Sequence, residues 1–168
     1  MIVSELEFSI HDELWMQRAL ELASRAEQHD EVPVGAVIVR DQKIIGEGFN
    51  QPISSCDPTA HAEIVALRMA ARHDQNYRIV GATLYVTLEP CTMCVGALVH
   101  ARISRLVFGA NEPKAGAVES KIRLLDCEHF NHKLDYKGGV CAAECQQQLS
   151  AFFQRRRKEF KQQAERGC

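Results

Sequence analysis

The sequence predicts an α/β protein with three layers, α/β/α, in which helices cover both faces of a central mixed sheet of about five strands. Two short segments rich in β-branched residues, 32–39 and 43–49, follow each other closely, which is typical of an antiparallel hairpin. The later strand segments, 82–88 and 105–109, alternate with helical segments, which is typical of crossover connections. No repeat or linker divides the chain, so we expect one domain over residues 1–168.

The first helix is expected over residues 12–28, with Asp12 as its N-cap, because a carboxylate can accept a hydrogen bond from a free N–H of the first turn. The segment after the fourth strand is expected to be an irregular loop followed by a short helix over 119–126. A short strand near 133–136 and a final basic helix over about 141–166 complete the prediction. The first helix is expected to pack against the sheet through apolar residues at helical spacing, which are Leu14, Trp15, Ala19, Leu22, Ala23 and Ala26.

Two shorter helices carry the residues of chemical interest. A helical segment covers Ala60 to about Arg72, and Thr59 is its expected N-cap. This start places His61 and Glu63 in the first turn. Pro90 ends the strand before it and is expected to begin the next helix as its first residue.

The composition describes an ordinary globular protein. Apolar residues make up 46% of the chain, charged residues make up 25%, and the net charge is −2, so no general attraction to nucleic acid is implied. We see no apolar run long enough to span a membrane, and the first ten residues do not read as a secretion signal. The seven cysteines are therefore expected to be reduced thiols in a cytoplasmic protein, and Cys141 and Cys145 are interpreted as ordinary cysteines.

Two motifs together predict a catalytic metal site. His61-Ala62-Glu63 offers an imidazole and a carboxylate, and Pro90-Cys91-Thr92-Met93-Cys94 offers two thiols three residues apart on one helix face. One nitrogen and two sulfur ligands suit zinc, and a site with three protein ligands keeps a position open for water, as catalytic zinc sites do. The carboxylate of Glu63 is suited to moving protons. The order H-x-E followed by P-C-x-x-C is the signature of zinc-dependent nucleobase deaminases.

Beyond these motifs, the chain resembles the bacterial tRNA-specific adenosine deaminases, which make inosine at the wobble position of the anticodon. The resemblance runs from about Trp15 to Lys158. It rests on five segments, which are Glu31-Val-Pro-Val-Gly-Ala36, Gly46-Glu-Gly-Phe-Asn50, Asp57-Pro-Thr-Ala-His-Ala-Glu-Ile64, Thr87-Leu-Glu-Pro-Cys-Thr-Met-Cys94 and Phe152-Phe-x-x-Arg-Arg156.

The resemblance implies a cytidine-deaminase-like fold, a homodimer and one catalytic zinc ion (Zn2+) per subunit. His61, Cys91 and Cys94 would hold the zinc, and Glu63 would be the proton shuttle for hydrolytic deamination at C6 of adenine. The same resemblance implies a pocket for the flipped base, formed by the side chains of Asn50, Val34 and Pro33 and by backbone groups around Ala62, Leu88 and Glu89.

The implied partner is the anticodon stem-loop of tRNA, whose unpaired bases can be turned out of the stack. The run Arg155-Arg156-Arg157-Lys158 reads from composition alone as a solvated helix face, with Phe152 and Phe153 in the core. The resemblance favours RNA contact instead. Candidate contacts are Phe153, Arg156, Arg157, Lys114 and Glu112, although Asn111-Glu112-Pro113 departs from the Asp and small residue that the family often carries there.

Two other functions are compatible with the same residues. The first is a deaminase of a free base or nucleotide, such as cytosine, guanine or deoxycytidylate, which would share the zinc site. The second is a non-enzymatic, zinc-stabilised RNA-binding module. Glu63 argues against the second, because a structural zinc site does not require a carboxylate beside an open position.

Overall fold

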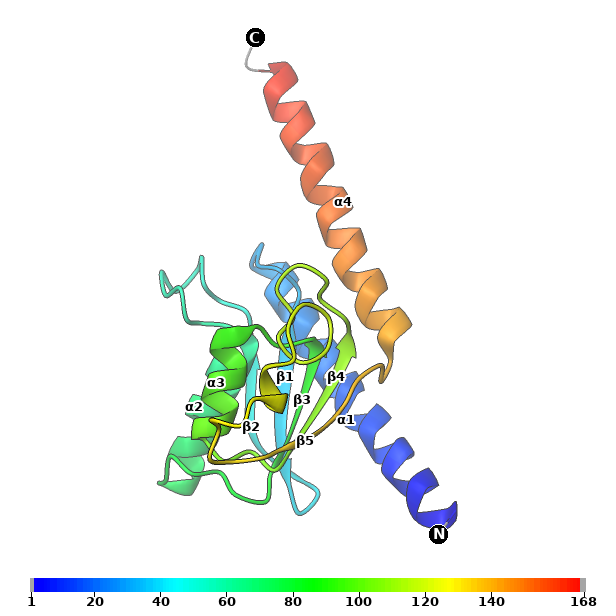
Figure 1. Ribbon diagram of the computed structural model, residues 1–168. Coiled ribbons are helices and arrows are strands. Elements are labelled where there is room, and N and C mark those ends of the chain that lie inside the picture. The colour runs from blue at the N-terminus through cyan, green and yellow to red at the C-terminus, as the bar shows by residue number, and fades with distance from the viewer. Residues whose placement is uncertain (1, 167–168) are drawn as a thin grey trace.

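A mixed sheet with the strand order β2-β1-β3-β4-β5 forms the centre of the molecule (Figure 1). The structure is a computed structural model, and it describes the backbone of residues 2–166 and the side chains of residues 10–165. The elements in chain order are α1 (Ile2–Gln28), β1 (Gly35–Arg40), β2 (Lys43–Phe49), α2 (Ala62–Asp74), β3 (Thr83–Leu88), α3 (Thr92–His100), β4 (Arg105–Ala110), a 3₁₀ turn (Leu124–Asp126), β5 (Asp135–Lys137) and α4 (Ala142–Arg166).

The pairing of the strands confirms the predicted mixed sheet. β1 pairs antiparallel with both β2 and β3, whereas β3, β4 and β5 are parallel to one another. The first pair is the predicted hairpin. The parallel strands are joined by crossovers, and the crossover from β3 to β4 contains α3.

Helices cover both faces of the sheet, as predicted. On one face, α2 and α3 pack against buried side chains such as Ile38, Leu84 and Phe108. On the other face, α1 and α4 pack against the alternate residues of the same strands, such as Val37 and Val107. Successive residues of a strand point to opposite faces, and here both faces are apolar because both are covered. The distal half of α4 extends beyond the sheet (Figure 1).

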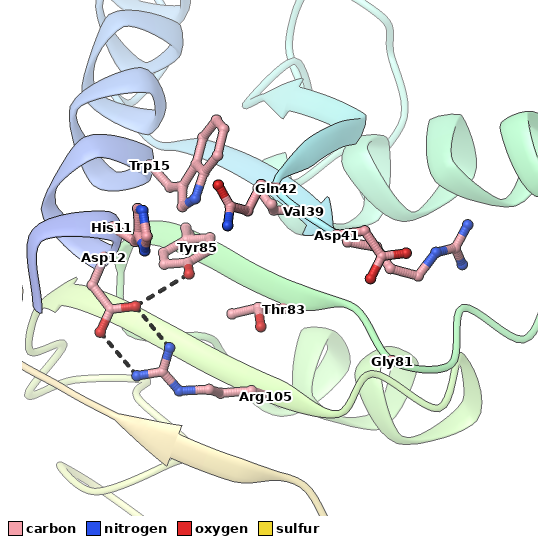
Figure 2. A pocket seen from close by; sticks show the side chains of 11 residues that line it. His11, Asp12, Trp15, Val39, Asp41, Gln42, Gly81, Thr83, Tyr85 and Arg105 are labelled. Carbon is pink, nitrogen blue, oxygen red and sulfur yellow. Dashed lines mark hydrogen bonds and ion pairs between the residues drawn. The ribbon is translucent and has the colours of Figure 1, made fainter. Parts of the chain in front are cut away.

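The prediction that α1 begins at Asp12 is wrong. The helix begins at Ile2, because residues 2–11 contain neither proline nor glycine and so do not interrupt it. Asp12 is buried within the helix, and its carboxylate accepts hydrogen bonds from Tyr85 Oη at 3.1 Å and from Arg105 at 2.7 and 2.9 Å (Figure 2). Lys137 adds a further ion pair at 3.2 Å. Asp12 therefore joins α1 to β3, β4 and β5.

Some predicted core positions also differ. Leu14 is exposed, and the core position of that helical turn is taken by Met16, which is fully buried. Trp15 is only half-buried, and it lines the pocket shown in Figure 2. Near residues 14–16, the buried face of α1 is therefore rotated relative to the face that the sequence predicted.

The two shorter helices begin later than predicted. α2 begins at Ala62 with His61 as its N-cap, so Thr59 is not the cap. Thr59 instead donates from its backbone N–H and its hydroxyl to the carboxylate of Asp57 in the preceding turn. α3 begins at Thr92 with Cys91 as its N-cap, so Pro90 lies outside the helix.

The helix predicted over residues 119–126 is reduced to the 3₁₀ turn Leu124–Asp126. The backbone N–H groups of Val118, Glu119 and Ser120 donate instead to the side chain of Glu89, which holds this segment in a non-helical form. Within the described residues, none of the helices has both the length and the apolar character needed to cross a membrane.

Candidate active site

The predicted metal ligands lie together where α2 and α3 begin. His61 and Cys91 are the N-caps of these helices, and both adopt an extended backbone conformation. Nδ1 of His61 lies 3.7 Å from Sγ of Cys91 and 3.6 Å from Sγ of Cys94. All three ligand atoms lie within 4.8 Å of one another. Neither side chain forms a capping hydrogen bond at the start of its helix.

These distances fit a zinc ion. With Zn–N and Zn–S bonds of about 2.05 and 2.3 Å at a tetrahedral angle, the nitrogen and sulfur atoms would be about 3.6 Å apart. Among the described side chains, this group of possible ligands contains two thiols and one imidazole, and no fourth ligand. The site thus has the composition of an open, catalytic zinc site and differs from a closed structural one.

The pKa of the Cys91 thiol is lower than that of an ordinary cysteine. Hydrogen bonds from Cys94 and His61 stabilise its thiolate and outweigh burial, so the pKa of Cys91 is lowered to about 4. Thiolate is the form that binds metal. The surroundings of Cys91 therefore favour its thiolate form.

Glu63 lies in the first turn of α2 and is 4% exposed. Burial raises the pKa of its carboxyl group above the ordinary value, because the charged form is separated from water. A carboxyl group with a raised pKa holds a proton more readily than an ordinary one, which suits a group that must both accept and return a proton. Its position, two residues after the ligand His61, suits the role of proton carrier.

Three of the predicted base-pocket residues are linked by hydrogen bonds. Oδ1 of Asn50 accepts from the backbone N–H of Ala62 at 2.9 Å, and the backbone N–H of Asn50 donates to the carbonyl of Val34 at 3.0 Å. Because Oδ1 is used in this way, Nδ2 of Asn50 is left as a donor, and it has no hydrogen bond within the described residues. Pro33 is also buried beside Val34.

Leu88 is the last residue of β3 and Glu89 follows it next to this site, but the side chain of Glu89 has a role that the sequence analysis did not predict. Its backbone N–H is already bonded to the carbonyl of Ala110 at 2.8 Å. Its carboxylate is 3% exposed and holds the loop after β4. A glutamate at the end of an otherwise apolar strand was the only signal in the sequence for this role.

The predicted RNA-binding residues are only partly brought together. Phe153 is 44% exposed, whereas the neighbouring Phe152 is buried, so only one of the two belongs to the core. A cavity of about 340 Å³ lies between α4 and the loop after β4. Its lining includes Phe153, Arg157 and Lys114. Arg156 lies outside this lining and pairs with Glu159 at 3.2 Å.

Glu112 belongs to the same loop and accepts a hydrogen bond from the backbone N–H of Lys114 at 2.9 Å. The basic surface continues along α4, where a second groove is lined by Gln154, Arg157, Lys158 and Lys161. The pocket of Figure 2 lies at the opposite end of the strands, between α1 and the β1–β2 turn, and no predicted site residue lines it.

Comparison with known proteins agrees with this site. The family model for the cytidine and deoxycytidylate deaminase zinc-binding region matches residues 9–110. The tRNA-specific adenosine deaminase of Haemophilus influenzae is 58% identical over 151 residues, which cover 89% of this chain and 87% of that protein. The protein of the same name from Bacillus subtilis is 44% identical over 150 residues, covering 89% and 93% of the two chains.

Solved structures are also similar. One comes from a study of A-to-I editing by tRNA:A34 deaminases at the wobble position, with a TM-score of 0.78 and 45% identity over 80% of this chain and 97% of that chain. A guanine deaminase from Bacillus subtilis gives a TM-score of 0.57 and 35% identity over 66% and 81% of the two chains. By sequence and by fold, this chain belongs to the family of tRNA-specific adenosine deaminases, within the cytidine and deoxycytidylate deaminases.

Proposed function

We propose that this protein deaminates adenosine to inosine at the wobble position of a tRNA anticodon, in a hydrolytic, zinc-dependent reaction that releases ammonia. One observation carries the proposal: His61, Cys91 and Cys94 form an open three-ligand group beside the buried carboxyl group of Glu63. The substrate is proposed from the high identity to relatives named for that activity.

Zinc in this group would supply a Lewis acid that lowers the pKa of water. The chain's own residues then determine the reaction. Glu63 takes a proton from the attacking water and delivers it to the ring nitrogen, and it then moves the proton of the hydroxyl group newly added at C6 to the departing amine, so that ammonia leaves and the C6 carbonyl forms. Burial raises the pKa of this carboxyl group and so favours its protonated form, which is the form that delivers a proton.

The base would be held by the first turn of α2 and the strands beside it. Nδ2 of Asn50 is the free donor there, and purine ring nitrogens are acceptors. Val34, Pro33 and Leu88 provide apolar walls, and the backbone near Ala62 and Glu89 completes the pocket. A buried, largely apolar pocket also excludes bulk water from the reacting atoms.

The RNA would lie along the basic side of α4. Phe153 is exposed next to Arg157 and Lys114, so an unpaired base could stack on the ring while phosphates meet the cations. Glu112 could accept from a ribose hydroxyl. Arg156 is a weaker candidate, because Glu159 already neutralises it.

We also propose that two copies of the chain form a homodimer with one zinc ion in each subunit. An almost entirely apolar groove runs between α2 and α3, and it supports this proposal because a second copy could cover it. Its lining includes Ile64, Leu67, Ile79 and the strongly exposed Tyr77. A cytoplasmic location follows from the proposed substrate.

The alternative is a deaminase of a free base or nucleotide. The similarity to a guanine deaminase favours it, because that enzyme shares the fold and 35% of the aligned residues. The basic, aromatic surface of α4 argues against it, since a free base requires no such surface.

The test is inosine formation on a short anticodon stem-loop with adenosine at the wobble position, compared with free adenosine, guanine and cytidine. Glu63→Gln is the control. We expect the stem-loop alone to react, and Glu63→Gln to abolish the reaction while zinc stays bound. Turnover of a free base or nucleoside with the stem-loop unchanged would refute the proposal.

A further inference from the structure

The carboxylate of Glu89 is the common hydrogen-bond acceptor for one loop. It accepts hydrogen bonds from the backbone N–H groups of Glu112 at 3.0 Å, Val118 at 3.0 Å, Glu119 at 2.7 Å and Ser120 at 2.9 Å, and from the hydroxyl of Ser120. All five donors come from the loop 112–120. Among the described residues, no cation pairs with Glu89, so backbone groups of this loop balance its charge.

This arrangement keeps Glu89 ionised although it is buried. Burial would raise the pKa of its carboxyl group, but the hydrogen bonds from Glu119, Ser120 and Glu112 outweigh burial and lower it. Hydrogen bonds to a buried charge are stronger than neutral ones, and their donors are costly to leave unpaired. The loop is therefore tightly held at both of its ends.

The same loop is held against the zinc half-site. Gly116 forms a backbone bridge with Cys91, and the N–H of Ala117 donates to the carbonyl of Pro90 at 2.8 Å. A Cβ atom at position 116 would lie 2.5 Å from Oε2 of Glu89 and 2.6 Å from the backbone carbonyl oxygen of Glu112, so a larger residue would displace the loop. The loop position is thus set by three consecutive residues, Glu89, Pro90 and Cys91.

Loop 112–120 contributes Lys114 to the lining of the cavity between α4 and the loop after β4, which we call the basic groove. Glu112 is bonded to Glu89 through its backbone N–H, and Lys114 follows two residues later in the lining of the groove beside Phe153 and Arg157. A shift of the Glu112 end of the loop away from Glu89 would move Glu112 and Lys114 relative to α4, whereas His61 and Cys91 stay held by the starts of α2 and α3.

We propose that Glu89 is a positioning residue for the nucleotides that flank the reacting base: it fixes loop 112–120 and thereby determines how firmly the RNA is held, with little influence on the chemical step. This inference rests on the proposed RNA substrate. The side chain of Glu89 acts only through this loop, and the part that Glu89 has in the base pocket belongs to its backbone, which Glu89→Gln leaves unchanged.

The test is Glu89→Gln with the stem-loop substrate. A glutamine keeps the size of the side chain, but its NH₂ group must face backbone N–H donors, which frees one end of the loop. We expect KM for the stem-loop to rise by about tenfold or more, with kcat at saturating RNA within about threefold of the wild type and zinc retained. Gly116→Ala displaces the same loop with Glu89 intact and should give the same KM effect. Ser120→Ala, which removes one of the five donors, should give a smaller one.

Asp12→Asn is the matched control, because it removes another buried carboxylate at a distance from the site and should leave KM unchanged. A fall in kcat with unchanged KM, loss of zinc from Glu89→Gln, or an unchanged KM in both Glu89→Gln and Gly116→Ala would overturn the inference. If Glu89→Gln does not fold, the KM values of Gly116→Ala and Ser120→Ala test the inference in its place. Failure of the wild type to convert the stem-loop would instead refute the proposed function.

Discussion

Asn50 combines two roles that two substitutions can separate. Its Oδ1 accepts the backbone N–H of Ala62 at 2.9 Å, and its Nδ2 is the donor proposed to bind the base. Asn50→Asp keeps an oxygen for Ala62 but replaces the donor by a second oxygen. Asn50→Ala removes both groups.

The magnitudes follow from the hydrogen bonds. In Asn50→Asp, an acceptor faces a purine nitrogen that is itself an acceptor, which should cost about 2–3 kcal/mol of transition-state binding, or roughly 30- to 150-fold in kcat/KM. Its folding stability should change little. In Asn50→Ala, the N–H of Ala62 at the start of α2 loses its partner, so the free energy of unfolding should also fall by about 1–2 kcal/mol.

The assays are inosine formation on the stem-loop, urea unfolding and zinc content for both variants. The reasoning is refuted if Asn50→Asp retains wild-type kcat/KM, since Nδ2 would then have no role in binding the base. It is equally refuted if both variants lose the same stability, because the bond to Ala62 would then not be preserved by aspartate.

Three further predictions concern other parts of the molecule. Asp12→Ala leaves Arg105 without its buried partner and should lower the free energy of unfolding by about 3–5 kcal/mol in urea. Burial raises the pKa of Asp12, but the pairing with Arg105 outweighs burial and lowers it, so its contribution to stability should be full above about pH 4 and should disappear as the pH falls further. Urea midpoints between pH 7 and pH 3 should therefore fall more in the wild type than in Asp12→Asn, and parallel curves would contradict this. Arg157→Ala should weaken stem-loop binding and reduce the slope of log K against log salt by about one, whereas Arg156→Ala, whose guanidinium pairs with Glu159, should change the slope less. Equal slopes for the two variants would contradict this assignment.

The sequence predicted the strands and the metal group more accurately than the helix ends. β-branched runs and motif spacing are local signals, so the hairpin of β1 and β2 and the closeness of His61 to Cys91 were predictable. Helix starts depend on partners that are distant in the chain. Asp12 is a good N-cap by residue type, but Arg105 in β4 makes it a buried ion-pair residue within a longer helix.

The loop after β4 could not be predicted for the same reason. Its residues 119–126 have helical character, but the N–H groups that would begin a helix bond to Glu89, about 30 positions earlier in the chain. Sequence periodicity contains no information about such a bond. The role of the Glu89 side chain therefore could not be predicted from the sequence, although its neighbours Pro90 and Cys91 belong to a motif that could.

A polar side chain that directly follows a strand lies beside each half of the candidate metal site. Asn50 follows β2 and bonds to Ala62, which lies between His61, the proposed ligand, and Glu63, the proposed proton carrier. Glu89 follows β3 and holds the loop that contacts Cys91. Both residues directly follow strands of the sheet, so the sheet helps to determine where the start of α2 and the loop beside Cys91 lie.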